Sequence, residues 1–98
     1  MPTFITLLNW TDQGVRAYKD TPKRYEGFTA ALQKLGCKLL NIYWTVGPYD
    51  LVVVLEGPDD ETATAALLQL CGLGNVRSTT MRAFDRQEID GIIAKATG

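Results

Sequence analysis

Apolar residues alternate with polar ones along four stretches of the chain, and this period of two predicts four β-strands. The stretches are rich in Val, Ile, Thr, Leu and aromatic residues and are bounded by Gly, Pro, Asn or Asp. The predicted strands span residues 3–10, 37–46, 49–56 and 75–84. The Gly47-Pro48 pair between the second and third stretches indicates that these two strands form a hairpin.

Three other stretches place apolar residues three and four positions apart, which predicts amphipathic helices. The first is expected to begin with Thr21 as its N-cap and to end at Gly36. The second begins in "GPDDE" and stops at Gly72, and the third opens with a capping box formed by Asp85 and Glu88. The polar segment 11–20 is expected to hold at most a short helical turn.

The resulting order, βαββαβ followed by a C-terminal helix, predicts an α+β fold. Two right-handed βαβ crossovers, each with an inserted strand, give a ferredoxin-like antiparallel sheet of four strands, with both main helices on one face. Its expected spatial order is fourth, first, third, second. At 98 residues, the whole chain, 1–98, fits a single domain.

Hairpin pairing predicts that both faces of the sheet are substantially apolar. One face would hold the pairs Trp44–Leu51, Ile42–Val53 and Leu40–Leu55. The other would hold Tyr43–Val52, Asn41–Val54 and Leu39–Glu56. Helices can cover only one of these faces, whereas an uncovered sheet face is normally polar. We therefore expect the sheet of a second copy to pack on the other face, forming a homodimer or a higher homo-oligomer.

Composition and charge exclude several classes of function. Hydrophobic residues make up 46% of the chain and charged residues 21%, which is ordinary for a globular domain. The formal net charge of −1 provides no basic excess for nucleic acid. No apolar run is long enough to cross a membrane, and the N-terminus lacks the features of a signal peptide. The expected location is the cytoplasm.

The chain has no histidine, which excludes histidine-ligated metals, histidine-bound haem and Ser/Cys–His catalysis. We therefore expect no metal and no cofactor. Cys37 and Cys71 lie far apart without a CxxC motif, so small buried side chains are favoured over a disulfide or a reactive thiol.

The predicted topology brings several polar and aromatic side chains to one end of the sheet. The first two strands finish there and the last two begin there, which gathers Asn9, Trp10, Tyr49, Asp50 and Arg77. One interpretation is a pocket mouth with aromatic walls and polar anchors. The alternative is a turn-stabilising Asp50, an ion pair with Arg77 and aromatic packing at the rim of a dimer.

Four basic residues near the start of the first main helix raise a smaller question. A solvated face is favoured over an anion site for this group, although a helix N-terminus can hold an anion. The group comprises Arg16, Lys19, Lys23 and Arg24.

Four segments in order, "TLLNWTDQGVR", "DTPKR", "YWTVGPYDLVVVLEGPDDETA" and "LGNVRSTTMRAF", resemble the GYD-domain family. The Gly-Tyr-Asp element is Gly47, Tyr49 and Asp50, with Pro48 inserted where the family is variable. The resemblance implies a small bacterial or archaeal protein of the dimeric α/β-barrel group, without an established activity. Proteins of that wider group include cofactor-free monooxygenases, haem-dependent enzymes, lactone isomerases and ligand-sensing domains.

Three hypotheses of function follow. In the first, the chain is a regulatory homo-oligomer that binds a small molecule through Asn9, Trp10, Tyr43, Tyr49, Asp50 and Arg77. In the second, it is a cofactor-free monooxygenase- or isomerase-like enzyme. There Asp50 or Tyr49 would handle a proton, with no catalytic residue assigned beyond these candidates. In the third, it is an assembly module whose interface is its function.

Overall fold

The computed structural model describes all residues, 1–98, and contains four strands and four α-helices. The strands are β1 (Thr3–Trp10), β2 (Lys38–Trp44), β3 (Leu51–Glu56) and β4 (Val76–Ala83). The helices are α1 (Asp12–Arg16), α2 (Thr21–Lys34), α3 (Asp60–Gly72) and α4 (Arg86–Thr97). A 3₁₀ turn, η1 (Tyr18–Asp20), precedes α2.

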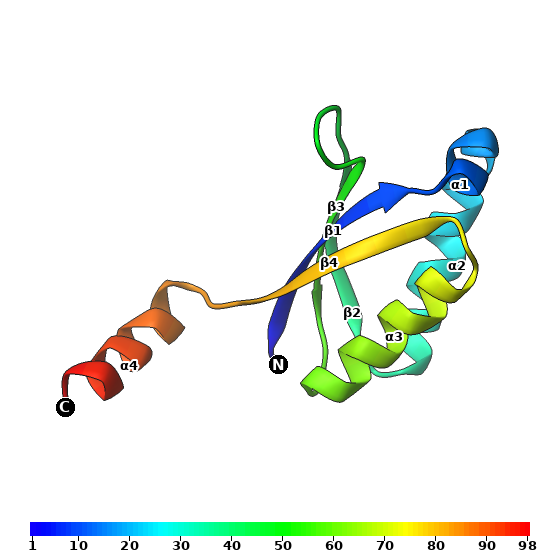
Figure 1. Cartoon of the computed structure of the whole chain (residues 1–98). Helices are drawn as coiled ribbons and strands as arrows, with labels where there is room; N and C mark the ends of the chain where they lie inside the picture. The colour runs from blue at the N-terminus through cyan, green and yellow to red at the C-terminus, as the bar shows by residue number, and fades with distance from the viewer.

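The four strands form one antiparallel sheet in the order β2-β3-β1-β4, which confirms the ferredoxin-like topology. Helices α2 and α3 lie side by side on one face of the sheet, whereas no helix covers the other face (Figure 1). We call this uncovered side the open face.

The hydrophobic core lies between the sheet and the two covering helices. Strand β1 alternates in burial because Phe4 and Leu8 point to the helices while Ile5 and Leu7 lie on the open face. Thr6 is fully buried, and its hydroxyl accepts a hydrogen bond of 2.8 Å from the Thr80 hydroxyl, so the buried oxygen is satisfied. The other core residues are Phe28, Leu32, Cys37, Leu51, Val53, Leu55, Ala63, Ala66 and Val76.

The predicted register of the hairpin is right near the turn and wrong farther from it. Trp44 pairs with Leu51, and the ladder continues regularly through the next three residues of β2. A β-bulge then follows, so Leu39 rather than Leu40 lies opposite Leu55. Because one extra residue reverses the side-chain alternation, Leu39 packs against the core and Leu40 is exposed.

Helix α2 begins one residue earlier than predicted. Turn η1 runs directly into the helix, so Asp20 occupies the N-cap position without a side-chain bond and Thr21 is already helical. The predicted stop is confirmed, since Gly36 has a φ of 74°, a conformation that favours glycine.

Asp59 is the N-cap of α3, where its carboxylate accepts a 2.7 Å hydrogen bond from the backbone N–H of Thr62. The side-chain and backbone hydrogen bonds with Thr62 hold the pKa of Asp59 below its usual value.

Burial raises the pKa of the Cys37 thiol, and the nearby Asp59 charge raises it further. Cys37 therefore remains a protonated core residue, as expected, and both cysteines are free.

Helix α4 extends away from the sheet and its covering helices (Figure 1), and the whole chain, α4 included, spans 52 × 31 × 18 Å. The predicted capping box of Asp85 and Glu88 is present, and Arg82 lies 3.7 Å from the Glu88 carboxylate. Isoleucines 89, 92 and 93 of this helix are all exposed. None of the helices has the length and apolar character needed to cross a bilayer.

Candidate functional site

The hairpin turn between β2 and β3 is fastened to the end of β1. The Asp50 carboxylate accepts a 2.9 Å hydrogen bond from the backbone N–H of Trp10. The backbone N–H of Asp50 donates to the Leu8 carbonyl, also at 2.9 Å. With its amide nitrogen facing the acceptors, Asn9 donates to the Pro48 carbonyl at 3.0 Å. These three hydrogen bonds link the hairpin turn to β1 beyond Leu8 and Leu51, the last pair of the β1–β3 ladder.

The turn is also bonded internally, which explains why β2 and β3 are shorter than predicted. The Thr45 N–H donates to the Asp50 carbonyl at 2.8 Å, and the Thr45 hydroxyl donates to the Tyr49 carbonyl at 2.6 Å. Gly47 adopts a φ of 150° within this turn, and Val46 is fully exposed. Residues 45–50 therefore form a closed turn and are not part of the strand ladder.

The sequence-predicted site residues do not all meet in one place. Asn9, Trp10, Tyr49 and Asp50 gather at the turn, as the topology requires. Arg77 pairs with Asn9 across the β1–β4 ladder, but it is exposed and makes no ion pair with Asp50. Tyr43, which pairs with Val52, is exposed on the open face. The bonds of Asp50 are those of a turn-stabilising residue.

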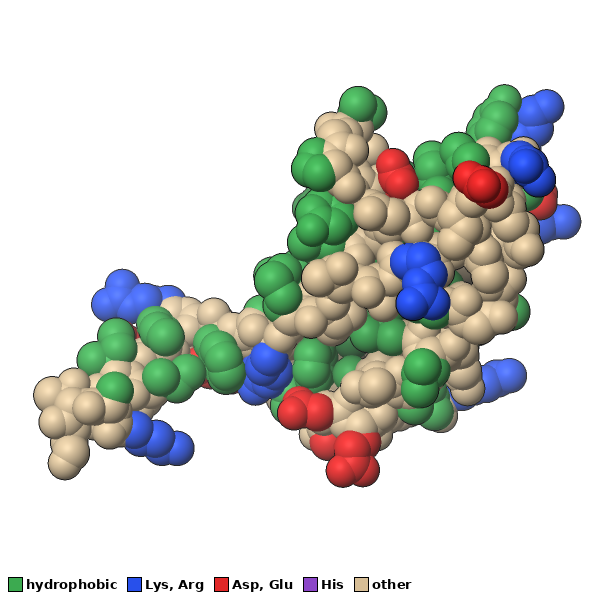
Figure 2. All heavy atoms as spheres, in the orientation of Figure 1, with side chains coloured by type: hydrophobic (Ala, Val, Ile, Leu, Met, Phe, Trp, Pro, Cys, Tyr) green, Lys and Arg blue, Asp and Glu red, His purple; other side chains and the backbone are tan.

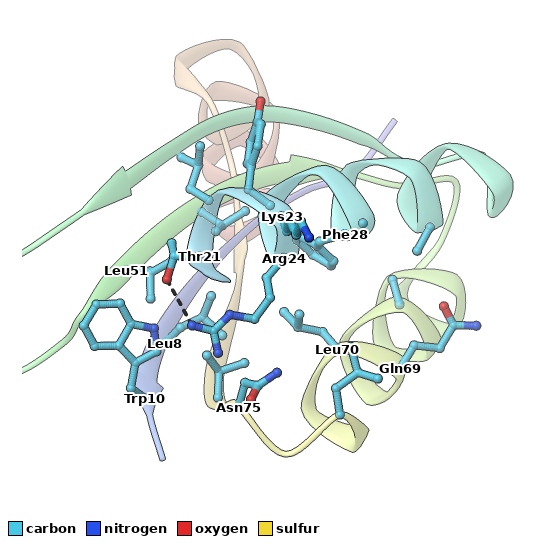
Figure 3. Close-up of a pocket in the computed structure, with 18 of the residues that line it drawn as sticks. Leu8, Trp10, Thr21, Lys23, Arg24, Phe28, Leu51, Gln69, Leu70 and Asn75 are labelled. Atoms are coloured by element: carbon cyan, nitrogen blue, oxygen red, sulfur yellow. Dashed lines mark hydrogen bonds between the residues drawn. The ribbon is translucent and has the colours of Figure 1, made fainter. Parts of the chain in front are cut away.

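A pocket of about 480 Å³ lies on the helix-covered side of the sheet, between the sheet and helices α2 and α3. Trp10 is the one predicted site residue that lines it. Thirteen of the nineteen lining residues are hydrophobic, so the walls are apolar and partly aromatic (Figure 3). They include Leu8, Trp10, Tyr25, Phe28, Ile42, Trp44 and Leu70. The rings of Tyr25 and Trp44 pack against each other with centroids 6.2 Å apart.

Arg24 brings a positive charge into this apolar pocket. Its Nη2 donates to the carbonyls of Gly14 at 3.2 Å and Ala17 at 3.0 Å, and to the Thr21 hydroxyl at 3.1 Å. The guanidinium lies among Leu8, Trp10 and Asn75 (Figure 3). Its Nη1 is buried and has no hydrogen-bond partner.

The connection between β1 and α2 turns the Arg24 side chain inward. The Thr11 hydroxyl caps α1 by accepting from Gly14 N–H at 3.1 Å, and it donates to the Gly74 carbonyl at 2.6 Å. Helix α1 is thereby held against the start of β4, and its last carbonyls face Arg24. The sequence prediction of a solvated basic face is therefore wrong for Arg24, although Arg16, Lys19 and Lys23 are exposed as expected.

A second hollow, of about 430 Å³, lies between α3 and β4 and is bordered by Arg77 and Arg82. It is more polar than the first, and Arg82 is already engaged with Glu88 and with the backbone carbonyls of Thr3 and Ala83. No three His, Cys, Asp or Glu side chains gather anywhere in the structure as metal ligands would. The first pocket is thus the better candidate site, and it suits an organic ligand.

Comparisons with known proteins find relatives in sequence and in structure. The chain is 36% identical over 85 residues to a Thermus thermophilus protein named glutamine synthetase and cystathionine beta-lyase binding protein. The match covers 86% of this chain and 90% of that one. The crystal structure of TTHA0845 from Thermus thermophilus is also similar, with 25% identity and a TM-score of 0.56. That comparison covers 87% of this chain and 95% of TTHA0845.

A more distant structure shares the fold alone. FFRP-DM1 superposes with a TM-score of 0.58 at 17% identity, over 86% of this chain and all of that one. The family model described as the GYD domain matches residues 4–93, which is nearly the whole chain. The resemblance carried by the Gly-Tyr-Asp turn and its flanking segments is therefore confirmed, and the chain belongs to the GYD domain family.

Proposed function

We propose that this GYD-domain protein binds a small apolar molecule in the pocket between the sheet, α2 and α3, and that it acts as a cytoplasmic ligand-sensing or regulatory homodimer. The observation that carries the proposal is an apolar pocket of about 480 Å³ lined by Arg24, a cation whose buried Nη1 has no hydrogen-bond partner. Ligand pockets of roughly 300–1,000 Å³ typically combine such apolar walls with a few placed polar groups.

The chemistry of the pocket lining favours the binding of a ligand. A buried donor without a partner costs roughly 1–3 kcal/mol, and more when the group is charged. Covering apolar walls with an apolar ligand instead of water contributes about 25 cal/mol per Å² of buried surface. A ligand with an apolar body and one acceptor group would satisfy the donor and cover the walls, which is the physical basis for binding at this site.

The enzyme hypothesis receives less support from the geometry. Catalysis requires a general acid or base beside the substrate, and the candidates from the sequence are Asp50 and Tyr49. Neither residue lines the pocket, and the Asp50 carboxylate is bonded to the backbone of Trp10. We therefore favour binding over catalysis.

Replacing Gly27 with leucine should block the pocket without harming the fold. Gly27 lines the pocket from within α2, and a Cβ built there meets no atom within 4 Å. Leucine is a better helix former by roughly 0.5–1 kcal/mol, so stability should rise slightly. Binding of 3-phenylpropionate and of its uncharged amide should both weaken by about tenfold or more, because the side chain occupies their space.

Tryptophan fluorescence provides the measurement for this variant. The chain has two tryptophans, Trp10 and Trp44, and both line the pocket. Their emission should therefore change as either probe is titrated into the wild type. Ala30→Leu is the matched control, since Ala30 is exposed on the same helix and does not line the pocket. Equal affinity of the Gly27→Leu variant and the control would rule out this pocket as the site.

The open face supports the second part of the proposal, the homodimer. Its apolar side chains come from all four strands and are half-buried or exposed without any covering element. They are Ile5, Leu7, Tyr43, Val52, Val54 and Met81. Hydrophobic side chains are also visible along the hairpin and on α4 in the space-filling view (Figure 2). A second copy would supply an equally apolar sheet, and burial of such area contributes about 25 cal/mol per Å².

Substituting Val54 with lysine should break this dimer. Val54 lies between Ile5 and Asn41 at the middle of the open face, so the new ammonium group would be buried without a partner in a sheet-to-sheet interface. We expect the dimer dissociation constant to rise by roughly 100-fold, since central interface positions are worth about 2 kcal/mol or more. The mass should be measured by light scattering, with circular dichroism as the check on folding.

Gln33→Lys adds the same charge on exposed α2 and serves as the control for that experiment. The control should remain dimeric at micromolar concentration. A wild-type protein that is monomeric under these conditions would overturn the dimer proposal, whatever the variants do.

A second candidate function is the binding of enzymes, which the name of the Thermus relative favours. The exposed isoleucines of α4 give this chain an apolar surface outside the sheet. Co-elution of the purified chain with glutamine synthetase of its own organism would favour this candidate. Ligand binding without such a complex would favour the first.

A further inference from the structure

We propose that the ligand of the pocket is an apolar monocarboxylate whose carboxylate binds Arg24 Nη1. This inference rests on the proposed function, because it names the class of molecule that the same pocket accepts. It follows from the bonding of the guanidinium, the charges around it and the position of a second donor.

The guanidinium of Arg24 is held in place by the protein on one side only. Its Nη2 is fixed by two backbone carbonyls and the Thr21 hydroxyl, which orients the planar group. Nη1 is buried and has no acceptor within the protein. A ligand oxygen at this nitrogen would complete a charge-assisted hydrogen bond, the stronger kind of hydrogen bond.

The charge of Arg24 is not neutralised within the protein. No aspartate or glutamate lines the pocket, whereas a second cation, Lys23, does. The two ion pairs of the structure, Arg82–Glu88 and Arg86–Asp90, lie outside this site. The pocket therefore favours an anion over a neutral ligand and disfavours a cation.

Asn75 supplies a second donor beside the guanidinium. Its Oδ1 accepts a 3.0 Å hydrogen bond from Gln13 Nε2, which fixes the orientation of the amide. The amide nitrogen keeps its hydrogens for another acceptor, and Asn75 lines the pocket together with Arg24 (Figure 3). Two neighbouring donors suit the two oxygens of one carboxylate. Most of the remaining wall is apolar or aromatic, so it suits an aromatic or branched hydrocarbon group.

Three matched probes test the ligand class on the wild-type protein by tryptophan fluorescence: 3-phenylpropionate, 3-phenylpropionamide and 3-phenylpropylamine. They share one apolar body and differ in head-group charge. We expect the amide to bind about tenfold or more weakly than the acid, and the amine to bind least. An amide or amine that binds as tightly as the acid would overturn the monocarboxylate assignment while leaving the pocket as a binding site.

The same titration distinguishes failure of this inference from failure of the proposed function. If none of the three probes changes the fluorescence, both the carboxylate assignment and the small-molecule site are wrong.

Arg24 itself is a poor variant because its Nη2 bonds hold α1 to α2. Asn75→Asp is nearly isosteric and keeps the oxygen that accepts from Gln13. The Asn75→Asp variant should bind 3-phenylpropionate about tenfold more weakly than the wild type and bind 3-phenylpropionamide with nearly unchanged affinity. An equal loss of affinity for both probes would contradict a contact between the carboxylate and Asn75.

Discussion

Replacing Gly14 with alanine is expected to lower the free energy of unfolding by about 3 kcal/mol or more. A Cβ on Gly14 would lie 1.9 Å from the backbone carbonyl oxygen of Asn75, closer than any real contact allows. The obstacle is backbone, so no rotamer change can relieve it. Helix α1 would have to move away from the start of β4. That movement would break the 3.0 Å bond from Thr11 N–H to the Asn75 carbonyl.

Urea denaturation of purified Gly14→Ala protein measures this effect. Gly27→Ala is the matched control, because a Cβ there meets nothing within 4 Å and alanine favours the helix. The control should be slightly more stable than the wild type. A Gly14→Ala protein as stable as the control would mean that α1 does not pack against β4 in this way. Because the Gly14 carbonyl also accepts from Arg24, the variant should lose ligand affinity as well.

The second large effect is expected for Asp50→Ala in the Gly-Tyr-Asp turn. The substitution removes the carboxylate that accepts from Trp10 N–H and leaves that part-buried donor unpaired. Hydrogen bonds to charged groups contribute roughly 1.5–3 kcal/mol, so the free energy of unfolding should fall by that amount. For a domain of this size, each kcal/mol lowers the melting temperature by roughly 4–8 °C.

Asp50→Asn is the informative comparison for the role of this residue. Asparagine keeps a carbonyl oxygen for Trp10 N–H and loses only the charge, so its melting temperature should lie between those of the wild type and Asp50→Ala. Affinity for 3-phenylpropionate should be nearly unchanged in both folded variants, since Asp50 does not line the pocket. An Asp50→Asn protein that is fully stable but no longer binds the probe would restore Asp50 as a ligand-binding residue.

Much of the fold could be predicted from the sequence, because the strand alternation, the helical periodicity and the capping residues all indicate the same order of elements. The extent of β1, the strand order and the Asp85–Glu88 capping box are all as predicted. The bulge in β2 could not be predicted in the same way. Leu39 and Leu40 are equally apolar, so either can face the core, and only packing against the helices selects Leu39.

The pocket was less predictable than the sheet, because it depends on how segment 11–20 folds. The sequence places Arg24 in a basic group at a helix start, where solvent exposure is the ordinary outcome. Its inward position arises from carbonyls of α1 and from the close approach of Gly14 to Asn75, which are tertiary contacts. The topology did bring Trp10 to the correct end of the sheet. However, whether its ring lines a pocket depends on α2 and α3.

An NMR titration of ¹⁵N-labelled protein with 3-phenylpropionate tests the assignment of this pocket most directly. The indole N–H signals of Trp10 and Trp44 report on the pocket, and the amides of Ile5 and Val54 report on the open face. We predict that both indole signals shift with saturation while the two open-face amides stay in place. Shifts confined to the open face, with both indole signals unmoved, would contradict the assignment.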